Sequence, residues 1–266
     1  MMLLSVQDFS VGFRRYDGLL HQRIVLALQG LSFGLDRGEV LAMVGASGAG
    51  KSLLAHALFD ILPPNAITAG QLLLDGVKLE RSNWPAHRGR RIGLVPQSAS
   101  HLDPLTRCAK QLAWAARRSG RKVGKAALNQ TLARFGLDAS TAHAFPHQLS
   151  GGMARRLMLA IATIGQPDLI VADEPTSGLD PSNAIAVLTH LRQLADAGNG
   201  VLLITHDLAQ ALPFANRVAI LQHGKLVDVE PASAFSGNGA ALQSAYARAL
   251  WHSMPENHFS ADPAHA

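Results

Sequence analysis

Eight consecutive residues, 45–52, restrict the possible folds of this chain more than any other part of its sequence. They match the pattern G-x-x-x-x-G-K-[ST], which forms a phosphate-binding loop when it joins a strand to a helix. That context is present, because the apolar run 40–44 precedes the segment and the helical pattern 53–58 follows it. Glycines let the backbone turn so that successive amides point inward, and the helix dipole adds to their attraction for phosphate. We therefore expect an anion cradle made of Gly45, Ala46, Ser47, Gly48, Ala49, Gly50, Lys51 and Ser52.

Two side chains of this cradle can contact a bound nucleotide and its metal ion. Lys51 is placed to reach the β- and γ-phosphates, and Ser52 offers a hydroxyl group to Mg²⁺. The metal ion would bridge phosphate oxygens that the amides cannot neutralise alone. The cradle therefore predicts a nucleoside triphosphate with Mg²⁺ as its ligand.

The chain is long and apolar enough to fold around its own core, since 48% of its 266 residues are hydrophobic. Its formal charge of +5 suits an anionic ligand but selects none. The single cysteine, Cys108, excludes an internal disulfide and a four-thiolate metal site. No run reaches the roughly 18 uncharged apolar residues of a membrane-spanning helix, and the first residues do not resemble a secretory signal. We therefore expect any membrane-spanning part to belong to another chain.

Short apolar runs alternate with helical patterns, which predicts an α/β fold with a parallel sheet wrapped by helices. After Arg217, alternating apolar residues on both sides of His223 and Gly224 predict a hairpin at a sheet edge. The apolar runs are short, branched and bounded by glycine, proline or charged residues, as buried strands are. The strands predicted from them are residues 40–44, 92–95, 169–172 and 201–204.

Between Gln97 and about Gly165 the strand pattern disappears, and helical composition takes its place. We expect three helices there, at residues 110–118, 125–135 and 153–164, with Gly136 ending the second in a left-handed conformation. The whole chain is expected to be one domain with three parts. These are a core at about residues 1–97 and 165–230, a helical subdomain at about 98–164 and a C-terminal extension at about 231–266.

Two adjacent carboxylates, Asp173 and Glu174, follow the apolar run 169–172. Ligands of open α/β sheets bind at this carboxyl end of the strands. Neighbouring residues on a strand point to opposite faces, so the two carboxylates are expected to have different tasks. We assign Asp173 to Mg²⁺, and Glu174 to the general base that activates a water molecule for attack on the γ-phosphorus.

The segment 149–153 separates this chain from the many nucleotide-binding proteins that share the two motifs above. It reads Leu-Ser-Gly-Gly-Met and resembles the signature sequence of ATP-binding cassette (ABC) ATPases. The order of the motifs strengthens this resemblance, which extends over nearly the whole chain. In sequence order they are the cradle 45–52, Gln97, the signature 149–153, Asp173 with Glu174, the loop 177–180, and Thr205 with His206 and Asp207.

The resemblance implies an α/β fold with a P-loop NTPase (RecA-like) core, a mixed sheet, an antiparallel β edge and a helical subdomain insert. It also implies ATP as the nucleotide, and two such domains stacked head to tail with each signature facing the ATP of the other. Ser150 and the amides of Gly151 and Gly152 would then form a second anion site at a helix start.

Further roles follow from the same resemblance by position in the sequence. His206 would contact the γ-phosphate and orient the general base or the attacking water, and Asp180 would couple the two sites across the interface. Gln97 would touch Mg²⁺ or the water, close to the contact with a membrane partner. Phe13 would stack on the adenine, with Tyr16 as the alternative.

Local features resemble the peptide and nickel importer branch of ABC ATPases, namely Met153 in the signature and the segments 102–106 and 246–250. They imply import of nickel, a metal chelate or short peptides. The partners would be integral membrane permease subunits, an extracytoplasmic solute-binding protein and a second ATPase, identical or paralogous, with no nucleic acid. The chain would then lie at the cytoplasmic face of the inner or plasma membrane.

Other functions stay open at this point, including the ATPase of a different ABC transporter. A non-transport ABC ATPase acting on nucleic acid would use the same motifs, but such proteins usually need long coiled-coil insertions or tandem cassettes, which this chain of 266 residues does not contain. A regulatory module that only binds nucleotide is a further possibility. Against it, the residues expected to act are all intact, namely Lys51, Ser52, Asp173, Glu174 and His206.

Overall fold

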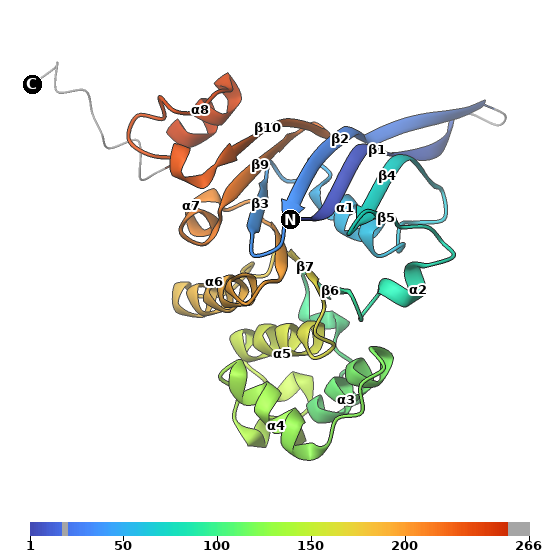
Figure 1. Ribbon diagram of the computed structural model, residues 1–266, viewed down its shortest axis with the longest axis vertical. Helices are drawn as coiled ribbons and strands as arrows, with labels where there is room; N and C mark the ends of the chain where they lie inside the picture. Colours follow the sequence, from blue (N-terminus) through green and yellow to red (C-terminus); the bar gives the residue numbers. More distant parts are fainter. Residues whose placement is uncertain (18–20, 255–266) are drawn as a thin grey trace, which may run out of the picture.

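The computed structural model describes residues 1–17 and 21–254, which form two β-sheets and a set of helices (Figure 1). One sheet has the strand order β2-β1-β4-β5, and the other has the order β10-β9-β3-β8-β7-β6. The strands are β1 (Met2–Asp17), β2 (His21–Asp36), β3 (Val40–Val44), β4 (Ala66–Leu74), β5 (Val77–Lys78), β6 (Ile92–Val95), β7 (Leu169–Asp173), β8 (Gly200–Ile204), β9 (Arg217–Gln222) and β10 (Lys225–Pro231). The helices are α1 (Lys51–Leu58), α2 (Trp84–His87), α3 (Cys108–Arg118), α4 (Lys125–Arg134), α5 (Gly151–Thr163), α6 (Pro181–Asp196), α7 (Leu208–Ala211) and α8 (Ala245–His252).

The six-stranded sheet forms the centre of the fold. Its strands β3, β6, β7, β8 and β9 run parallel, and β10 returns antiparallel to β9 at the edge. Every residue of β3, β7 and β8 is buried, because both faces of the sheet are covered. The four strands predicted from short apolar runs are confirmed. The edge hairpin is confirmed as well, with positive φ at both His223 and Gly224 in its turn.

Side chains of the central strands alternate between two apolar clusters, one on each face of the sheet. In β7, Leu169 and Val171 pack with residues of the four-stranded sheet and α1, whereas Ile170 and Ala172 pack with residues of α3, α5 and α6. Because successive side chains of a strand point to opposite faces, one unbroken apolar run can serve both cores. This arrangement holds the carboxyl ends of the strands in place between two packed layers.

Three helices, α3, α4 and α5, lie together at one end of the molecule, away from the four-stranded sheet (Figure 1). They confirm the three helices predicted between Gln97 and Gly165. The structure begins α5 at Gly151 rather than at Met153, because the Ser150 hydroxyl accepts a hydrogen bond from the Met153 amide at 3.2 Å and so caps the helix. Gly136 follows α4 with a φ of 63°, as predicted for a left-handed helix end.

The strands of the four-stranded sheet were not among those predicted from apolar runs. Strands β1 and β2 are each 16 residues long and pair antiparallel, but their register shifts at several points along their length. Each shift displaces side chains from strict alternation between the two faces. The buried apolar residues of β1 are therefore unevenly spaced, and the sequence lacks the alternation that would predict a strand. These residues are Leu3, Leu4, Val6, Phe9 and Val11.

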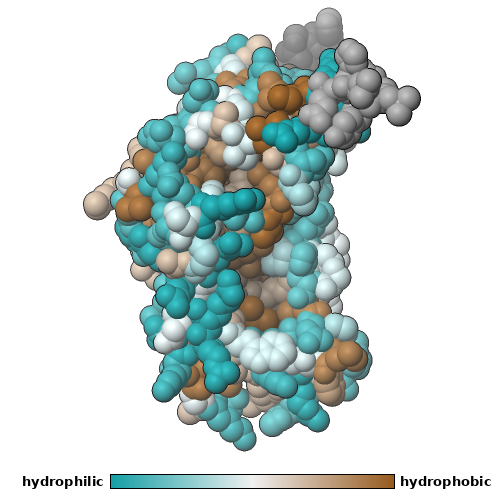
Figure 2. Space-filling view, turned by 90° about the vertical axis from the view of Figure 1, so that its right-hand side faces the viewer, coloured by the Kyte–Doolittle hydropathy of each residue, from teal (hydrophilic) through white to brown (hydrophobic). Residues whose placement is uncertain are grey.

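Among residues 1–17 and 21–254, no helix combines the length and the apolar character needed to cross a bilayer. On the face seen in Figure 2, hydrophilic side chains predominate. Apolar side chains gather in a recess between the part that holds the sheets and the end formed by α3, α4 and α5, here called the helical end.

Two arginines and two aspartates form a ring of ion pairs near the amino ends of β6 and β7. Arg37 pairs with Asp75 at 2.7 Å and with Asp168 at 2.9 Å. Arg91 pairs with the same two carboxylates, and its distance to Asp168 is 2.8 Å. The four residues come from the β2–β3 turn, the β4–β5 turn and the residues just before β6 and β7. The ring therefore ties the two sheets together.

Because of this ring, we expect Asp168→Asn to lower the free energy of unfolding by about 1–2 kcal/mol at pH 7. Burial alone would raise the pKa of Asp168, but hydrogen bonds from Arg37 and Arg91 outweigh it and hold the pKa below its ordinary value. Such a carboxylate stabilises the fold above the unfolded-state pKa of about 3.9, and this contribution is lost as the pH falls through the folded-state pKa.

Urea unfolding from neutral to acidic pH measures this effect. The difference between wild type and Asp168→Asn should be largest near pH 7 and should shrink as the pH falls below about 4. Asp138→Asn is the control, because Asp138 is exposed and forms no ion pair with any described residue. A wild-type advantage that stayed constant over the whole pH range would contradict the role given to Asp168.

Candidate functional site

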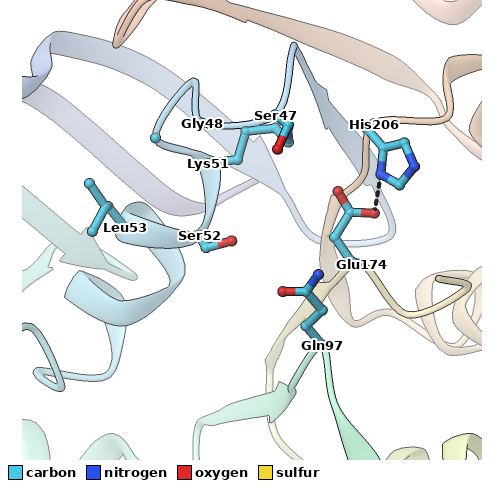
Figure 3. Close-up of a pocket in the computed structure, with 9 residues that line it drawn as sticks. Ser47, Gly48, Lys51, Ser52, Leu53, Gln97, Glu174 and His206 are labelled. Atoms are coloured by element: carbon cyan, nitrogen blue, oxygen red, sulfur yellow. Dashed lines mark hydrogen bonds and ion pairs between the residues drawn. The ribbon is translucent and has the colours of Figure 1, made fainter. Parts of the chain in front are cut away.

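A pocket of about 470 Å³ opens where α1 begins and where β6, β7 and β8 end (Figure 3). Its walls come from four segments that lie far apart in the sequence, and the parallel sheet brings them to one edge. The sequence predicts every lining residue except Leu53. They are Ser47, Gly48, Gly50, Lys51, Ser52, Leu53, Gln97, Glu174 and His206.

The backbone of the loop before α1 depends on its glycines, and Gly45 and Gly50 show two different reasons. A Cβ atom at Gly45 would lie 2.2 Å from the carbonyl oxygen of Leu221, so a larger residue would collide with β9. Gly50 has a φ of 100° and leads directly into α1, which begins at Lys51. The loop can therefore lie close to the sheet and still direct the positive end of the α1 dipole towards the pocket.

Lys51 is held inside the loop rather than extended into solvent. The residue is 6% exposed, and its ammonium group donates to the carbonyls of Gly45 at 2.7 Å and Ala46 at 3.1 Å. Burial lowers its pKa, although the charges of Glu174 and Asp173 act in the opposite direction. An ammonium group has three donors. One donor is therefore left for an acceptor that enters the pocket.

Ser52 and Asp173 join the start of α1 to the end of β7. The Ser52 hydroxyl donates to Oδ1 of Asp173 at 3.0 Å. Burial raises the pKa of Asp173, and the charge of Glu174 adds to this effect, while the hydrogen bond from Ser52 opposes it. A cation beside this carboxylate would favour its charged form. Since hydroxyl and carboxylate oxygens are ligands that Mg²⁺ prefers, these two side chains fit a magnesium ion.

Glu174 adopts a φ of 47°, a left-handed conformation that is uncommon for a residue with a side chain. Strand β7 ends at Asp173, and the Glu174 amide donates to the carbonyl of Ile204 at 2.8 Å. The two carboxylates do have different partners, but the reason predicted from strand alternation is wrong, because the strand ends at Asp173 and Glu174 lies beyond it in the turn that follows. Backbone strain of this kind costs about 1–3 kcal/mol and is concentrated at functional sites.

Glu174 and His206 form a pair at the pocket, with 2.8 Å between Oε2 of the carboxylate and Nδ1 of the imidazole (Figure 3). The Glu174 side chain is only 8% exposed, whereas that of His206 is 61% exposed. The histidine can therefore hold the carboxylate and contact a ligand at the same time. Gln97, which follows β6, lines the same pocket from the side of the helical end.

Several residues predicted to contact the nucleotide do not line this pocket. Phe13 lies on β1 opposite Val25 of β2 and packs partly buried against the cluster beneath the four-stranded sheet. The side chain of Tyr16, the alternative aromatic residue, lies outside the described part of the structure. Asp180 caps α6, and hydrogen bonds from Ser182 and Asn183 lower its pKa.

The signature segment also lies outside the pocket, at the start of α5. Its Ser150 and Gly151 are exposed, whereas Gly152 is buried. A Cβ atom at Gly152 would lie 2.2 Å from Oδ1 of Asn183, but one at Gly151 would be 3.7 Å from its nearest neighbour. Asn183 in turn donates to Asp180 at 2.6 Å. Gly152 is therefore required by packing against α6, while Ser150 and Gly151 remain open to a partner.

Sequence comparison finds a family model and several related proteins that resemble this chain. The family model described as ABC transporter matches residues 28–177, more than half of the chain. The nickel import ATP-binding protein NikD of Pseudomonas putida is 40% identical over 225 residues, which cover 82% of this chain and 86% of that protein. The dipeptide transport ATP-binding protein DppD of Bacillus subtilis is 34% identical over 239 residues, which cover 85% of this chain and 70% of that protein.

A third relative is longer. The oligopeptide transport ATP-binding protein OppD of Mycobacterium tuberculosis is 38% identical over 237 residues, or 85% of this chain, which spans only 38% of that protein. Among solved structures, the dimeric structure of MJ0796, a bacterial ABC transporter cassette, matches with a TM-score of 0.74 and 26% identity, covering 86% of this chain and 99% of that chain. The family model, the related sequences and the similar fold all point to the same family as the motifs around the pocket. This chain belongs to the ABC transporter family.

Proposed function

We propose that this chain binds ATP with Mg²⁺ and hydrolyses it to drive a membrane importer. The observation that carries the proposal is the meeting of Lys51 and the Ser52–Asp173 pair with the Glu174–His206 pair at one pocket. The names of related proteins support it, because they describe ATP-binding proteins of nickel import and dipeptide transport. A structural neighbour, with a TM-score of 0.73, is a cassette bound to ADP and Pi.

Lys51 is the group that would hold the terminal phosphates of ATP. Its ammonium group now donates to two loop carbonyls, and it would turn one or more donors to phosphate oxygens when the nucleotide enters. The amides at the start of α1 would add to this attraction. Ser52, Asp173 and Gln97 would hold Mg²⁺, which supplies positive charge against the phosphates when bound.

Glu174 would act as the general base. Its carboxylate would take a proton from a water molecule while the water oxygen attacks the γ-phosphorus and the bond from phosphorus to the ADP oxygen breaks. His206 would hold the carboxylate through its 2.8 Å contact and touch the γ-phosphate with its exposed side. Gln97 would position the water or the metal ion from the edge of the pocket.

The ATP would be shared between two ATPase chains arranged head to tail. Ser150 and Gly151 are exposed at the start of α5 and do not line the pocket of their own chain, so they suit an ATP held by another chain. A related cassette is dimeric in two solved structures. We infer that the signature residues Ser150, Gly151 and Gly152 close on the partner's nucleotide. In the same assembly Asp180 would lie at the interface, and Phe13 would stack on the adenine.

The transported substrate would be nickel, a metal chelate or a short peptide. This follows from the NikD, DppD and OppD relatives, which are named for nickel import and for dipeptide and oligopeptide transport. The chain would act at the cytoplasmic face of the membrane, bound to integral membrane permease subunits. A second ATPase, identical or paralogous, and an extracytoplasmic solute-binding protein would complete the system.

Purification of the tagged chain from detergent-solubilised membranes of its own host tests this proposal. We expect integral membrane proteins to co-purify, and we expect Mg²⁺-dependent ATP hydrolysis that rises when a solute-binding protein loaded with nickel or peptide is added. Co-purification with nucleic acid instead of membrane proteins would favour the non-transport alternative. An assembled complex that binds ATP without hydrolysing it would contradict the enzymatic role.

A further inference from the structure

Arg155 lies inside α5, one helical turn beyond the exposed start of the signature helix. Its guanidinium group donates from one nitrogen to the carbonyl of Pro96 at 3.0 Å and from another to the carbonyl of Ser177 at 3.2 Å. The two acceptors belong to different loops, one after β6 and one after β7. One side chain thus joins three segments that lie far apart in the sequence.

Both acceptors are directly connected to residues of the candidate site. Pro96 precedes Gln97, which lines the pocket. The amide of Ser177 donates to the carbonyl of Glu174 at 3.2 Å, so Ser177 closes the turn that begins at the strained residue. A movement of Arg155 would therefore displace both the loop of Gln97 and the turn of Glu174.

The position of Arg155 is costly for a charged group. The residue is only 7% exposed, and within residues 1–17 and 21–254 no carboxylate forms an ion pair with it. Burial accordingly lowers the pKa of its guanidinium. A buried charge without a counter-charge destabilises a fold unless its donors are satisfied. The two carbonyls provide that satisfaction, because each accepts a hydrogen bond from a different nitrogen of the planar guanidinium group.

We propose that Arg155 is a positioning residue for ATP hydrolysis, which ties the signature helix to the Gln97 loop and the Glu174 turn of the same chain. A partner that closes on Ser150 and Gly151 pushes on α5, and Arg155 carries that displacement to the two loops beside the pocket. This inference rests on the proposed function, because it assigns Arg155 to the same hydrolytic site. It also goes beyond the motif residues, since Arg155 does not line the pocket.

Variants at Arg155, compared with a matched arginine elsewhere, separate positioning from simple stabilisation. Arg192 of α6 is the control, because it also donates to the carbonyls of two separate segments, Gly38 at 3.0 Å and Phe214 at 3.4 Å, and does not line the pocket. In the assembled complex, Arg155→Met should lower kcat for ATP hydrolysis by roughly 10- to 100-fold and leave the KM for ATP within about 3-fold. Arg155→Gln, which keeps one NH2 group as a hydrogen-bond donor, should retain part of the rate. Arg192→Met should lower the melting temperature and leave kcat unchanged.

Hydrogen exchange supplies a second readout that does not need activity. In Arg155→Met and, more weakly, in Arg155→Gln, the amides of Gln97, Ser98, Glu174 and residues 176–178 should exchange faster than in the wild type, whereas Arg192→Met should not affect them. Unchanged kcat in folded variants, or a parallel loss of ATP binding and hydrolysis, would overturn the proposal. So would unchanged exchange in both loops. If the wild-type complex itself fails to hydrolyse ATP, the proposed function falls, and the exchange data still decide whether Arg155 holds the two loops.

Discussion

Replacing Glu174 by glutamine is expected to reduce ATP hydrolysis by roughly 10²- to 10⁴-fold while ATP still binds. Glutamine keeps the size of the side chain and an oxygen that can face His206, but it cannot accept a proton from water at neutral pH. The nucleotide would therefore stay between the two ATPase chains, and the dimer that it holds together would persist. Phosphate release measures the first effect, and light scattering with Mg²⁺ and ATP measures the second.

A second buried glutamate provides the control for this substitution. Glu230 is 1% exposed and accepts a hydrogen bond from the backbone amide of Gln243. A glutamine at position 230 could accept the same hydrogen bond with its side-chain oxygen. It does not line the pocket, so Glu230→Gln should hydrolyse ATP at the wild-type rate. Wild-type turnover in Glu174→Gln would remove Glu174 from the role of general base.

Replacing Lys51 by alanine should instead weaken the binding of Mg²⁺–ATP itself, by roughly 10²-fold. The substitution removes a buried cation from beside the expected phosphates, and it also removes the two hydrogen bonds to Gly45 and Ala46 that hold the loop. Both losses act on binding before any chemical step. Isothermal titration calorimetry of the isolated chain measures the effect without requiring turnover.

The control for Lys51 is an exposed lysine on the edge strand of the six-stranded sheet, outside the residues that line the pocket. Lys225 begins β10 and is exposed, so Lys225→Ala should bind Mg²⁺–ATP like the wild type. Equal affinities of wild type and Lys51→Ala would count against the phosphate cradle. The two substitutions, at Lys51 and at Glu174, therefore separate binding from hydrolysis at one pocket.

The central strands could be predicted because both of their faces are buried. Strand β7 reads as one apolar run followed by acids, and no other local structure explains such a run as simply. Strands β1 and β2 could not be found in the same way, because register shifts break their alternation and Asp8 adopts a φ of 46° inside β1. Short strands that are buried on both faces can thus be predicted from the sequence. Long strands with register shifts cannot, because their positions are determined by pairing between distant residues.

In the site, too, the features that follow from local sequence could be predicted, and those that depend on contacts between distant residues could not. Lys51, Ser52 and Glu174 belong to local motifs whose spacing predicts their chemistry, and the structure brings all three to the region of one pocket. The contact of Arg155 with Ser177 and the left-handed conformation of Glu174 had no such sequence pattern, because both arise from tertiary packing. The predicted adenine contact of Phe13 stays a prediction, since that side chain does not line the pocket.

The central claim is that one ATP is held by two chains. The most direct test is the structure of the Glu174→Gln complex with Mg²⁺ and ATP. Our account predicts the triphosphate on residues 45–52 of one ATPase chain, with Ser150 and Gly151 of its partner against the γ-phosphate. A triphosphate bound away from residues 45–52, or a signature segment that contacts no nucleotide in the closed complex, would contradict it.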